Sequence, residues 1–156
     1  MLYDFFAFPH RDTGGEAFVW LGHNAFLRPA HFDQDRLIGP SGRDVPGERS
    51  LTYFLTHELT HILTADALGI WRYLRLEPWQ QEGYADYVAK AGDFDYFGTR
   101  AKFRAGDPAL DPERSGLYLR YHLLVAHLLD QLGMTVPDLL ARPMRGDPIE
   151  AKLRLR

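Results

Sequence analysis

The stretch "YFLTHELTHILTA", residues 53–65, decides how the chain is read. It places His57 and His61 four residues apart, with Glu58 directly after the first histidine. On an α-helix, side chains four positions apart lie about 5–6 Å from each other on one face. Two imidazoles at that spacing can bind one zinc ion, at about 2.0–2.1 Å from each nitrogen. The spacing therefore predicts a zinc-binding helix.

The residues around this stretch predict where the helix begins and ends. Leucine and isoleucine recur at helical spacing from Leu51 onward. Ser50 precedes them as a favoured N-cap, and Gly69 follows the last of them as a favoured helix end. We therefore predict a helix that begins after Ser50 and runs to about Leu68.

A catalytic zinc ion usually has three protein ligands and a water molecule, so the pattern requires one more ligand. The chain has no cysteine, which leaves histidine, aspartate or glutamate. Pro78 predicts the start of a second helix, "PWQQEGYADYVAKA", which ends at Gly92. Glu82 on this helix is the best candidate, because the 20 residues after His61 can hold a turn and an antiparallel return.

Asp86 lies four residues after Glu82 and therefore on the same face of the second helix. A metal-bound imidazole usually donates its other N–H group to a carboxylate or a carbonyl. We expect Asp86 to orient a zinc histidine in this way, His57 rather than His61.

The two motifs together resemble the gluzincin zinc metallopeptidases, the family that contains thermolysin and the aminopeptidase N relatives. The first is "HELTH" and the second is "WQQEGYADYV", whose matching residues are Trp79, Glu82, Gly83 and Ala85. The resemblance implies that His57, His61 and Glu82 bind zinc and that Glu58 is the general base of peptide hydrolysis. It also implies that Asp86 supports a zinc ligand.

The resemblance extends, less specifically, to two other segments. Gluzincins commonly stabilise the oxyanion with a tyrosine or histidine from a later helix, and "GLYLRYHLLVAHLLDQLG" is similar to that helix. Tyr118 is the first candidate, His122 lies four residues later on the same face, and Tyr121 is the alternative. Upstream, "HNAF" resembles the edge strand that holds peptide substrates, so Asn24 and Ala25 would bind a substrate strand through their backbone.

The remaining segments complete an expected α+β, zincin-like domain that spans residues 1–156. Aromatic and β-branched runs at 3–8 and 16–22 flank a Pro- and Gly-containing turn, which predicts a β-hairpin. Residues 117–132, ended by Gly133, predict a third helix, and residues 136–142 a short fourth. We expect a long surface excursion over 92–116 and a frayed basic tail over 150–156. Zincin folds often place a further helix behind the zinc helix, which a partner or an omitted segment would supply.

Composition limits the classes of function. The 156 residues are 46% hydrophobic and 25% charged, as in globular domains, and the net charge of −3 does not favour nucleic acid as a partner. Asp4 and Pro9 interrupt the N-terminal segment, which lacks the cationic start and long apolar run of a signal peptide. We therefore expect a cytoplasmic protein with no membrane span, with a fragment of an exported protein as the alternative. The resemblance to gluzincins implies a peptide or protein as the substrate.

Two alternatives to an active peptidase stay open at this point. The chain could be a catalytically inactive zinc-binding module, or it could hydrolyse a small non-peptide amide. Glu58 favours hydrolysis, because a general base has no part in binding the metal. No Gly-x-Met-Glu-Asn type motif anchors a free amino terminus, which favours an endopeptidase over an aminopeptidase.

Overall fold

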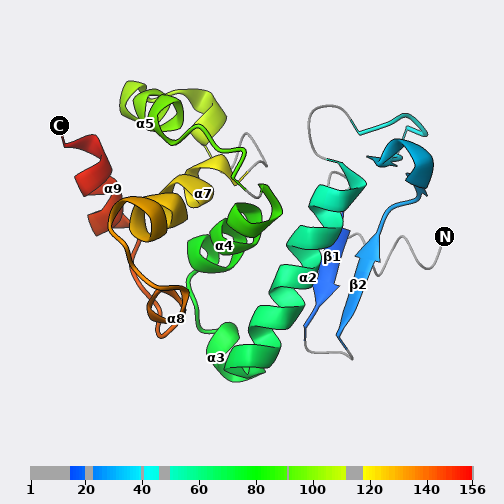
Figure 1. Cartoon of the computed structure of the whole chain (residues 1–156), viewed down its shortest axis with the longest axis horizontal. Coiled ribbons are helices and arrows are strands. Elements are labelled where there is room, and N and C mark those ends of the chain that lie inside the picture. The colour runs from blue at the N-terminus through cyan, green and yellow to red at the C-terminus, as the bar shows by residue number, and fades with distance from the viewer. Residues whose placement is uncertain are drawn as a thin grey trace. The chain divides into compact units, whose positions relative to one another are not determined.

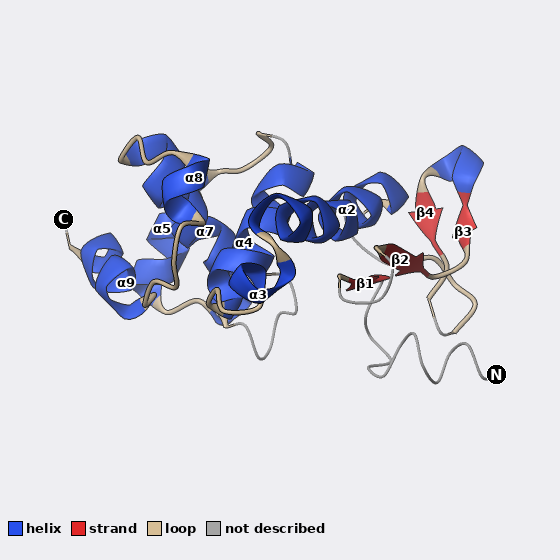
Figure 2. Cartoon of the chain, turned by 90° about the horizontal axis from the view of Figure 1, so that it is seen from below, coloured by secondary structure: helices blue, strands red, loops and turns tan. Residues whose placement is uncertain are grey.

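The computed structural model describes residues 15–19, 23–39, 41–45, 50–90, 92–111 and 118–155. In this part of the chain the fold is α+β, with helices and two small antiparallel sheets, as the sequence predicts. The chain divides into two compact units, Met1–Ile70 and Trp71–Arg156. Figures 1 and 2 label the elements of both units.

The first unit contains both sheets. β1 (Gly15–Phe18) pairs with β2 (Asn24–Leu27), so that Gly15 lies opposite Leu27 and Phe18 opposite Asn24. β3 (Ala30–His31) pairs with β4 (Arg36–Leu37) across the 3-10 turn η1 (Phe32–Gln34), as Figure 2 shows. The second strand of the predicted hairpin, 16–22, overlaps β1. Its first strand, 3–8, lies outside the described residues, so the pairing of the two stays a prediction.

The helix α2 (Leu51–Leu68) begins and ends where the sequence predicts. The hydroxyl of Ser50 accepts a hydrogen bond from the backbone N–H group of Tyr53 at 3.0 Å, which caps the first turn. Gly69 ends the helix with a φ angle of 81°, a conformation that glycine adopts without steric cost. α2 packs against β1 and β2 (Figure 1).

The second unit is helical and is built around two helices that pack against each other. α4 (Pro78–Lys90) begins at the predicted proline. Its main partner is α7 (Leu119–Ala126), which continues as the π-helical segment η3 (His127–Gln131) and ends before Gly133, as predicted. The short helices α3 (Ile70–Tyr73) and α8 (Val136–Leu139) precede and follow this pair along the chain, and α8 was predicted.

Side chains in the first turn of α4 form hydrogen bonds with the backbone of residues 139–144, at and after the end of α8. Gln80 is fully buried, and its Nε2 donates to the carbonyl oxygens of Leu139 and Arg142 at 2.7 and 3.0 Å. Its Oε1 accepts from the backbone N–H group of Met144 at 2.9 Å. The indole Nε1 of Trp79 donates to the carbonyl oxygen of Met144 at 2.8 Å. These bonds satisfy backbone groups that have no regular partners.

The prediction of a surface excursion over residues 92–116 is wrong in its centre. Residues Tyr96–Ala105 form helix α5, and a 3-10 turn, η2 (Pro108–Leu110), follows it. The carboxylate of Asp95 caps α5 by accepting from the N–H group of Gly98 at 2.9 Å. Tyr96 and Phe103 are buried. The glycine and aspartate residues that indicated a loop are the caps of a short helix.

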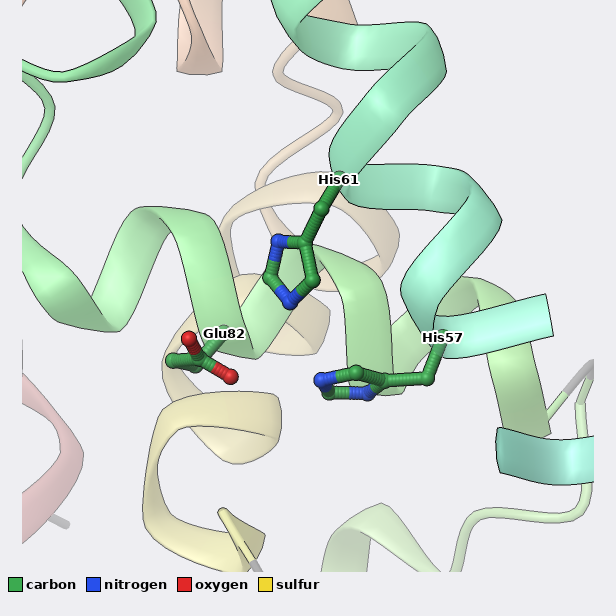
Figure 3. A group of neighbouring side chains, drawn as sticks. All are labelled: His57, His61 and Glu82. Atoms are coloured by element: carbon green, nitrogen blue, oxygen red, sulfur yellow. The ribbon is translucent and has the colours of Figure 1, made fainter. Parts of the chain in front are cut away.

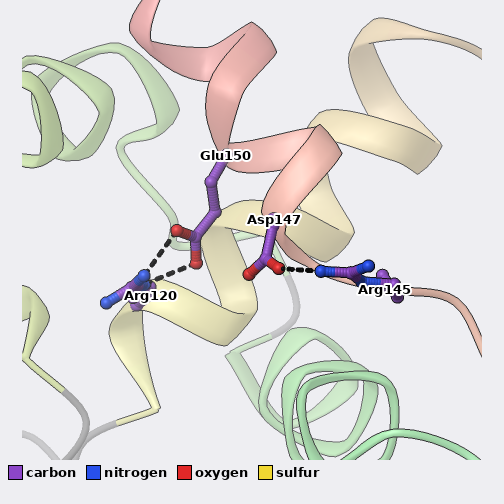
Figure 4. A network of polar contacts seen from close by, with 4 residues as sticks. All are labelled: Arg120, Arg145, Asp147 and Glu150. Carbon is purple, nitrogen blue, oxygen red and sulfur yellow. Dashed lines mark hydrogen bonds and ion pairs between the residues drawn. The ribbon is translucent and has the colours of Figure 1, made fainter.

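The prediction of a frayed C-terminal tail is also wrong, because residues Asp147–Arg154 form helix α9. Leu153 is fully buried, and the guanidinium of Arg120 on α7 forms an ion pair with Glu150, as Figure 4 shows. Arg145 pairs with Asp147 at 2.8 Å in the first turn of α9. Arg120 lies 30 residues before Glu150 in the sequence, so local composition does not reveal this partner of the helix.

α4 approaches α7 closely at Gly83, and a substitution there tests this packing. A Cβ atom at Gly83 would lie 2.6 Å from the carbonyl oxygen of Tyr121 and 3.0 Å from Cγ2 of Val125. We expect Gly83→Ala to lower the free energy of unfolding by about 1–3 kcal/mol, measured by urea denaturation. Alanine otherwise favours a helix interior, so a loss of stability identifies the steric contact.

Gly146 offers a matched control in the same unit. A Cβ atom there would make an ordinary contact, 3.4 Å from Cδ1 of Trp79, and its φ angle of −72° suits any residue. We expect Gly146→Ala to change the stability by less than about 0.5 kcal/mol. Equal stabilities of the two variants would contradict the close packing at Gly83.

Candidate metal centre

The three predicted zinc ligands have the positions that the motif requires on their helices. His57 and His61 are buried on one face of α2, with their ring centroids 4.8 Å apart. Glu82 lies in the second turn of α4 and is half-buried. Each of the three offers one ligand atom, and these atoms lie within 4.8 Å of one another. Figure 3 draws the three side chains.

This donor set fits zinc in its chemistry. Two imidazoles and one carboxylate form the protein ligand set of several catalytic zinc enzymes, in which water takes the fourth position. The group is therefore chemically suitable for zinc, and its occupancy stays a prediction.

Glu58 is buried within the first unit, beside the backbone of β1. A Cβ atom at Gly15 would lie 3.0 Å from both Cγ and Oε1 of Glu58, and 2.7 Å from Cδ2 of Leu27. Glycine at the first position of β1 therefore leaves the space that the Glu58 carboxylate occupies. The sequence motif identifies Glu58 but gives no signal for Gly15, whose role depends on the packing of the strand.

Asp86 forms the centre of a buried polar network in the second unit. It is fully buried, and its Oδ2 accepts from Nδ1 of His122 at 2.8 Å and from Nζ of Lys90 at 2.6 Å. The sequence predicts His57 as the partner of Asp86, and that bond stays a prediction. The network joins α4, which carries Asp86 and Lys90, to α7, which carries His122.

His122 is buried and its ring stacks on Phe94, with the centroids 3.8 Å apart. Burial lowers the pKa of His122, and the hydrogen bond to Asp86 opposes this effect. A carboxylate only accepts hydrogen bonds, so the proton of the neutral imidazole lies on Nδ1. Nε2 of His122 is then an acceptor. In this form, His122 cannot donate a hydrogen bond to an oxyanion.

Tyr118, the first candidate for an oxyanion donor, has an unusual backbone. It is the N-cap of α7 and adopts the left-handed conformation, with φ 47° and ψ 15°. Such strain in a residue other than glycine costs energy and is concentrated at functional sites. The ring of Tyr118 stacks on that of Tyr121, with the centroids 6.1 Å apart. The sequence gives no signal of this strain.

Asn24 and Ala25, the predicted substrate-binding residues, lie on β2 of the first unit. Asn24 is the register partner of Phe18, and Ala25 is that of Ala17. The rings of Phe18 and Phe26 meet edge to face, 5.3 Å apart, on this hairpin. The last three residues of "HNAF" therefore belong to a strand, as the resemblance implies. Binding of a substrate to this strand stays a prediction.

No family model matches the chain, and no curated protein or solved structure matches it. Among the described residues, no helix has both the length and the apolar character needed to cross a bilayer. Function is therefore inferred from the side chains themselves.

Proposed function

We propose that the chain is a zinc-dependent metallopeptidase of the gluzincin type. The observation that carries the proposal is the group of His57, His61 and Glu82, whose ligand atoms lie within 4.8 Å of one another. Glu58, next to His57 in the sequence, adds a buried carboxylate that the zinc ligand set does not require. The proposed reaction is the hydrolysis of a peptide bond in a peptide or protein substrate.

The residues have separate roles in this reaction. Zinc bound by His57, His61 and Glu82 would polarise the substrate carbonyl group and lower the pKa of a water molecule. Glu58 accepts the proton of the attacking water on its carboxylate and returns it to the leaving amine. The backbone of β1 beside Glu58 limits where the carboxylate can lie.

Tyr118 is the favoured donor to the oxyanion among the three candidates. A phenol hydroxyl carries a proton at neutral pH and can donate it in a hydrogen bond. Tyr121 is the alternative, because its ring stacks on that of Tyr118. His122 is less suited to this role, because its Nδ1 proton is directed to Asp86. Its proposed role is to fix Asp86.

The test is a digest of a peptide library by the zinc-loaded chain, read by mass spectrometry, with metal content measured in parallel. We expect about one zinc ion per chain and cleavage that a chelator abolishes and added zinc restores. Zinc binding without any cleavage would favour the inactive zinc-binding module. Cleavage that survives removal of all metal would contradict the proposal.

Gly15→Ala tests the placement of the proposed general base. The added methyl group would displace Glu58, so we expect kcat to fall by about tenfold or more while zinc stays bound. Kinetics on one cleaved peptide and metal analysis check this.

The double variant Gly15→Ala with Leu27→Ala separates two causes, because it removes the leucine that the new methyl group also meets. Activity that stays low in the double variant supports displacement of Glu58. Full recovery would assign the effect to the hairpin instead.

A further inference from the structure

The second unit contains a pocket of about 350 Å³ that none of the proposed zinc ligands lines. This volume is in the range of small-molecule sites in proteins, about 300–1,000 Å³. Its walls come from the end of α4, from the segment before α5 together with the first residue of α5, and from α7 and η3. The pocket lies entirely within one compact unit.

Aromatic rings form the walls of the pocket. Phe94 stacks on His122 at 3.8 Å between centroids, and Tyr87 lies on the same imidazole at 5.6 Å. The hydroxyl of Tyr96 forms a hydrogen bond with Nδ1 of His127 at 2.7 Å, which fixes a further ring of the lining. Ring faces carry negative electrostatic potential and attract cations.

Asp130 adds a carboxylate to these rings. It lies on η3, a π-helical segment, and such segments frequently occur at functional sites. Its Oδ1 accepts from the hydroxyl of Tyr87 at 2.7 Å, and this bond contributes most to raising the pKa of Tyr87 to about 12. Tyr87 therefore keeps its proton at neutral pH and donates it in this hydrogen bond.

Charged groups of both signs lie around the pocket, and the charges of Arg100 and Arg104 oppose the rise in the pKa of Tyr96 in its lining. Asp86, behind His122, forms an ion pair with Lys90 at 2.6 Å, so these two charges offset each other. His122 is neutral at pH 7, because burial lowers its pKa. Of the lining residues in the described part of the chain, Asp130 is then the one that carries a charge.

We propose that this pocket binds a primary ammonium group on an apolar stem, carried by a lysine side chain of a peptide or by a free alkylamine. Asp130 pairs with the ammonium group, and Tyr87, Phe94 and Tyr96 contact the group and its stem. An ammonium ion is a compact charge that a single carboxylate oxygen can bind.

The test measures binding to the full zinc-loaded chain by calorimetry, with Glu58→Gln as background so that no peptide is cut. Two probe pairs are compared: pentylammonium with 1-pentanol, and an acetyl-Gly-Lys-Gly amide with the same peptide carrying norleucine. We expect the charged member of at least one pair to bind about tenfold or more tightly than its neutral partner. The pair with the higher affinity identifies the source of the ammonium group.

Asp130→Asn is the decisive variant. We expect it to remove the preference for the charged probe, whereas Asp33→Asn, at an exposed position in the first unit, keeps it. Equal affinities within both pairs, no binding of any probe, or a preference that survives Asp130→Asn would overturn the proposal. None of these outcomes depends on peptidase activity, so the pocket and the proposed function can fail separately.

A second measurement covers the case in which Asp130→Asn does not fold. Binding of the charged probe to the Glu58→Gln background is then compared at low salt and at about 0.5 M salt, where charge pairs are screened. We expect the preference for the charged probe to fall severalfold. An unchanged preference would overturn the proposed role of Asp130.

Discussion

Replacing Glu58 with glutamine is expected to lower kcat for peptide hydrolysis by about 10²–10⁴-fold while zinc stays bound. Glutamine has nearly the same shape as glutamate, but its amide cannot take the proton of the attacking water. Glu58 is buried, so bulk solvent is a poor substitute for its carboxylate. Steady-state kinetics on a peptide from the library digest and metal analysis of the same samples provide the measurement.

Glu77→Gln is the matched control for this variant. Glu77 is exposed directly before α4, and its replacement changes the net charge by the same amount. We expect its kinetics to equal those of the unchanged chain. If Glu58→Gln keeps full activity, Glu58 is not the general base. If Glu58→Gln loses its zinc, Glu58 has a structural role in the metal centre.

The two helices that carry the proposed ligands were predictable because their boundary signals are local. Ser50 caps α2 through a bond to a residue three positions away, and Gly69 ends it with a positive φ angle. Pro78 begins α4 because the N–H groups of a first helical turn have no acceptor within the helix, so proline, which has no N–H group, loses no hydrogen bond there. Each signal acts within a few residues, so the sequence alone contains it.

The burial of α2 was not predictable from the same pattern. Leu55, Leu59 and Leu63 recur at helical spacing, yet they are 41%, 41% and 65% exposed. The buried face carries His57 and Glu58 instead. Periodicity predicts that a segment is helical, but the packing of other elements decides which face is covered.

The contacts that hold the residues around the proposed metal centre were not predictable from the sequence either. The spacing of His57 and His61 identifies two donors, because helical geometry relates residues four positions apart, and Glu82 was proposed because 20 residues can hold a turn and an antiparallel return. The space beside Glu58 at Gly15 depends on β1, and the bond from His122 to Asp86 depends on α7. Such tertiary contacts leave no pattern in a single sequence.

Asp86 lies between His122, with which it forms a hydrogen bond, and Glu82, the proposed zinc ligand on the same helix. It lies one helical turn after Glu82 on the same face of α4, and His122 joins that face to α7. A carboxylate fixed by two hydrogen bonds restricts the movement of its helix turn. Asp86 is therefore expected to affect both the stability of the second unit and the position of Glu82.

Replacing Asp86 with alanine is expected to lower the free energy of unfolding by about 3–5 kcal/mol, because it leaves the charge of Lys90 and the ring of His122 without their acceptor. Urea denaturation of the metal-free chain measures this cost. In variants that still fold, we expect zinc affinity to fall by about 10–100-fold, as measured by competition with a chelator.

Two further variants make this prediction specific. Asp86→Asn keeps the shape and one acceptor oxygen, so we expect a smaller loss of stability than for alanine. Asp93→Ala, at an exposed position after α4, is expected to change neither stability nor zinc affinity. A loss of stability with unchanged zinc affinity in Asp86→Ala would confine Asp86 to the packing of α4 on α7. A loss of both would connect that packing to the metal centre.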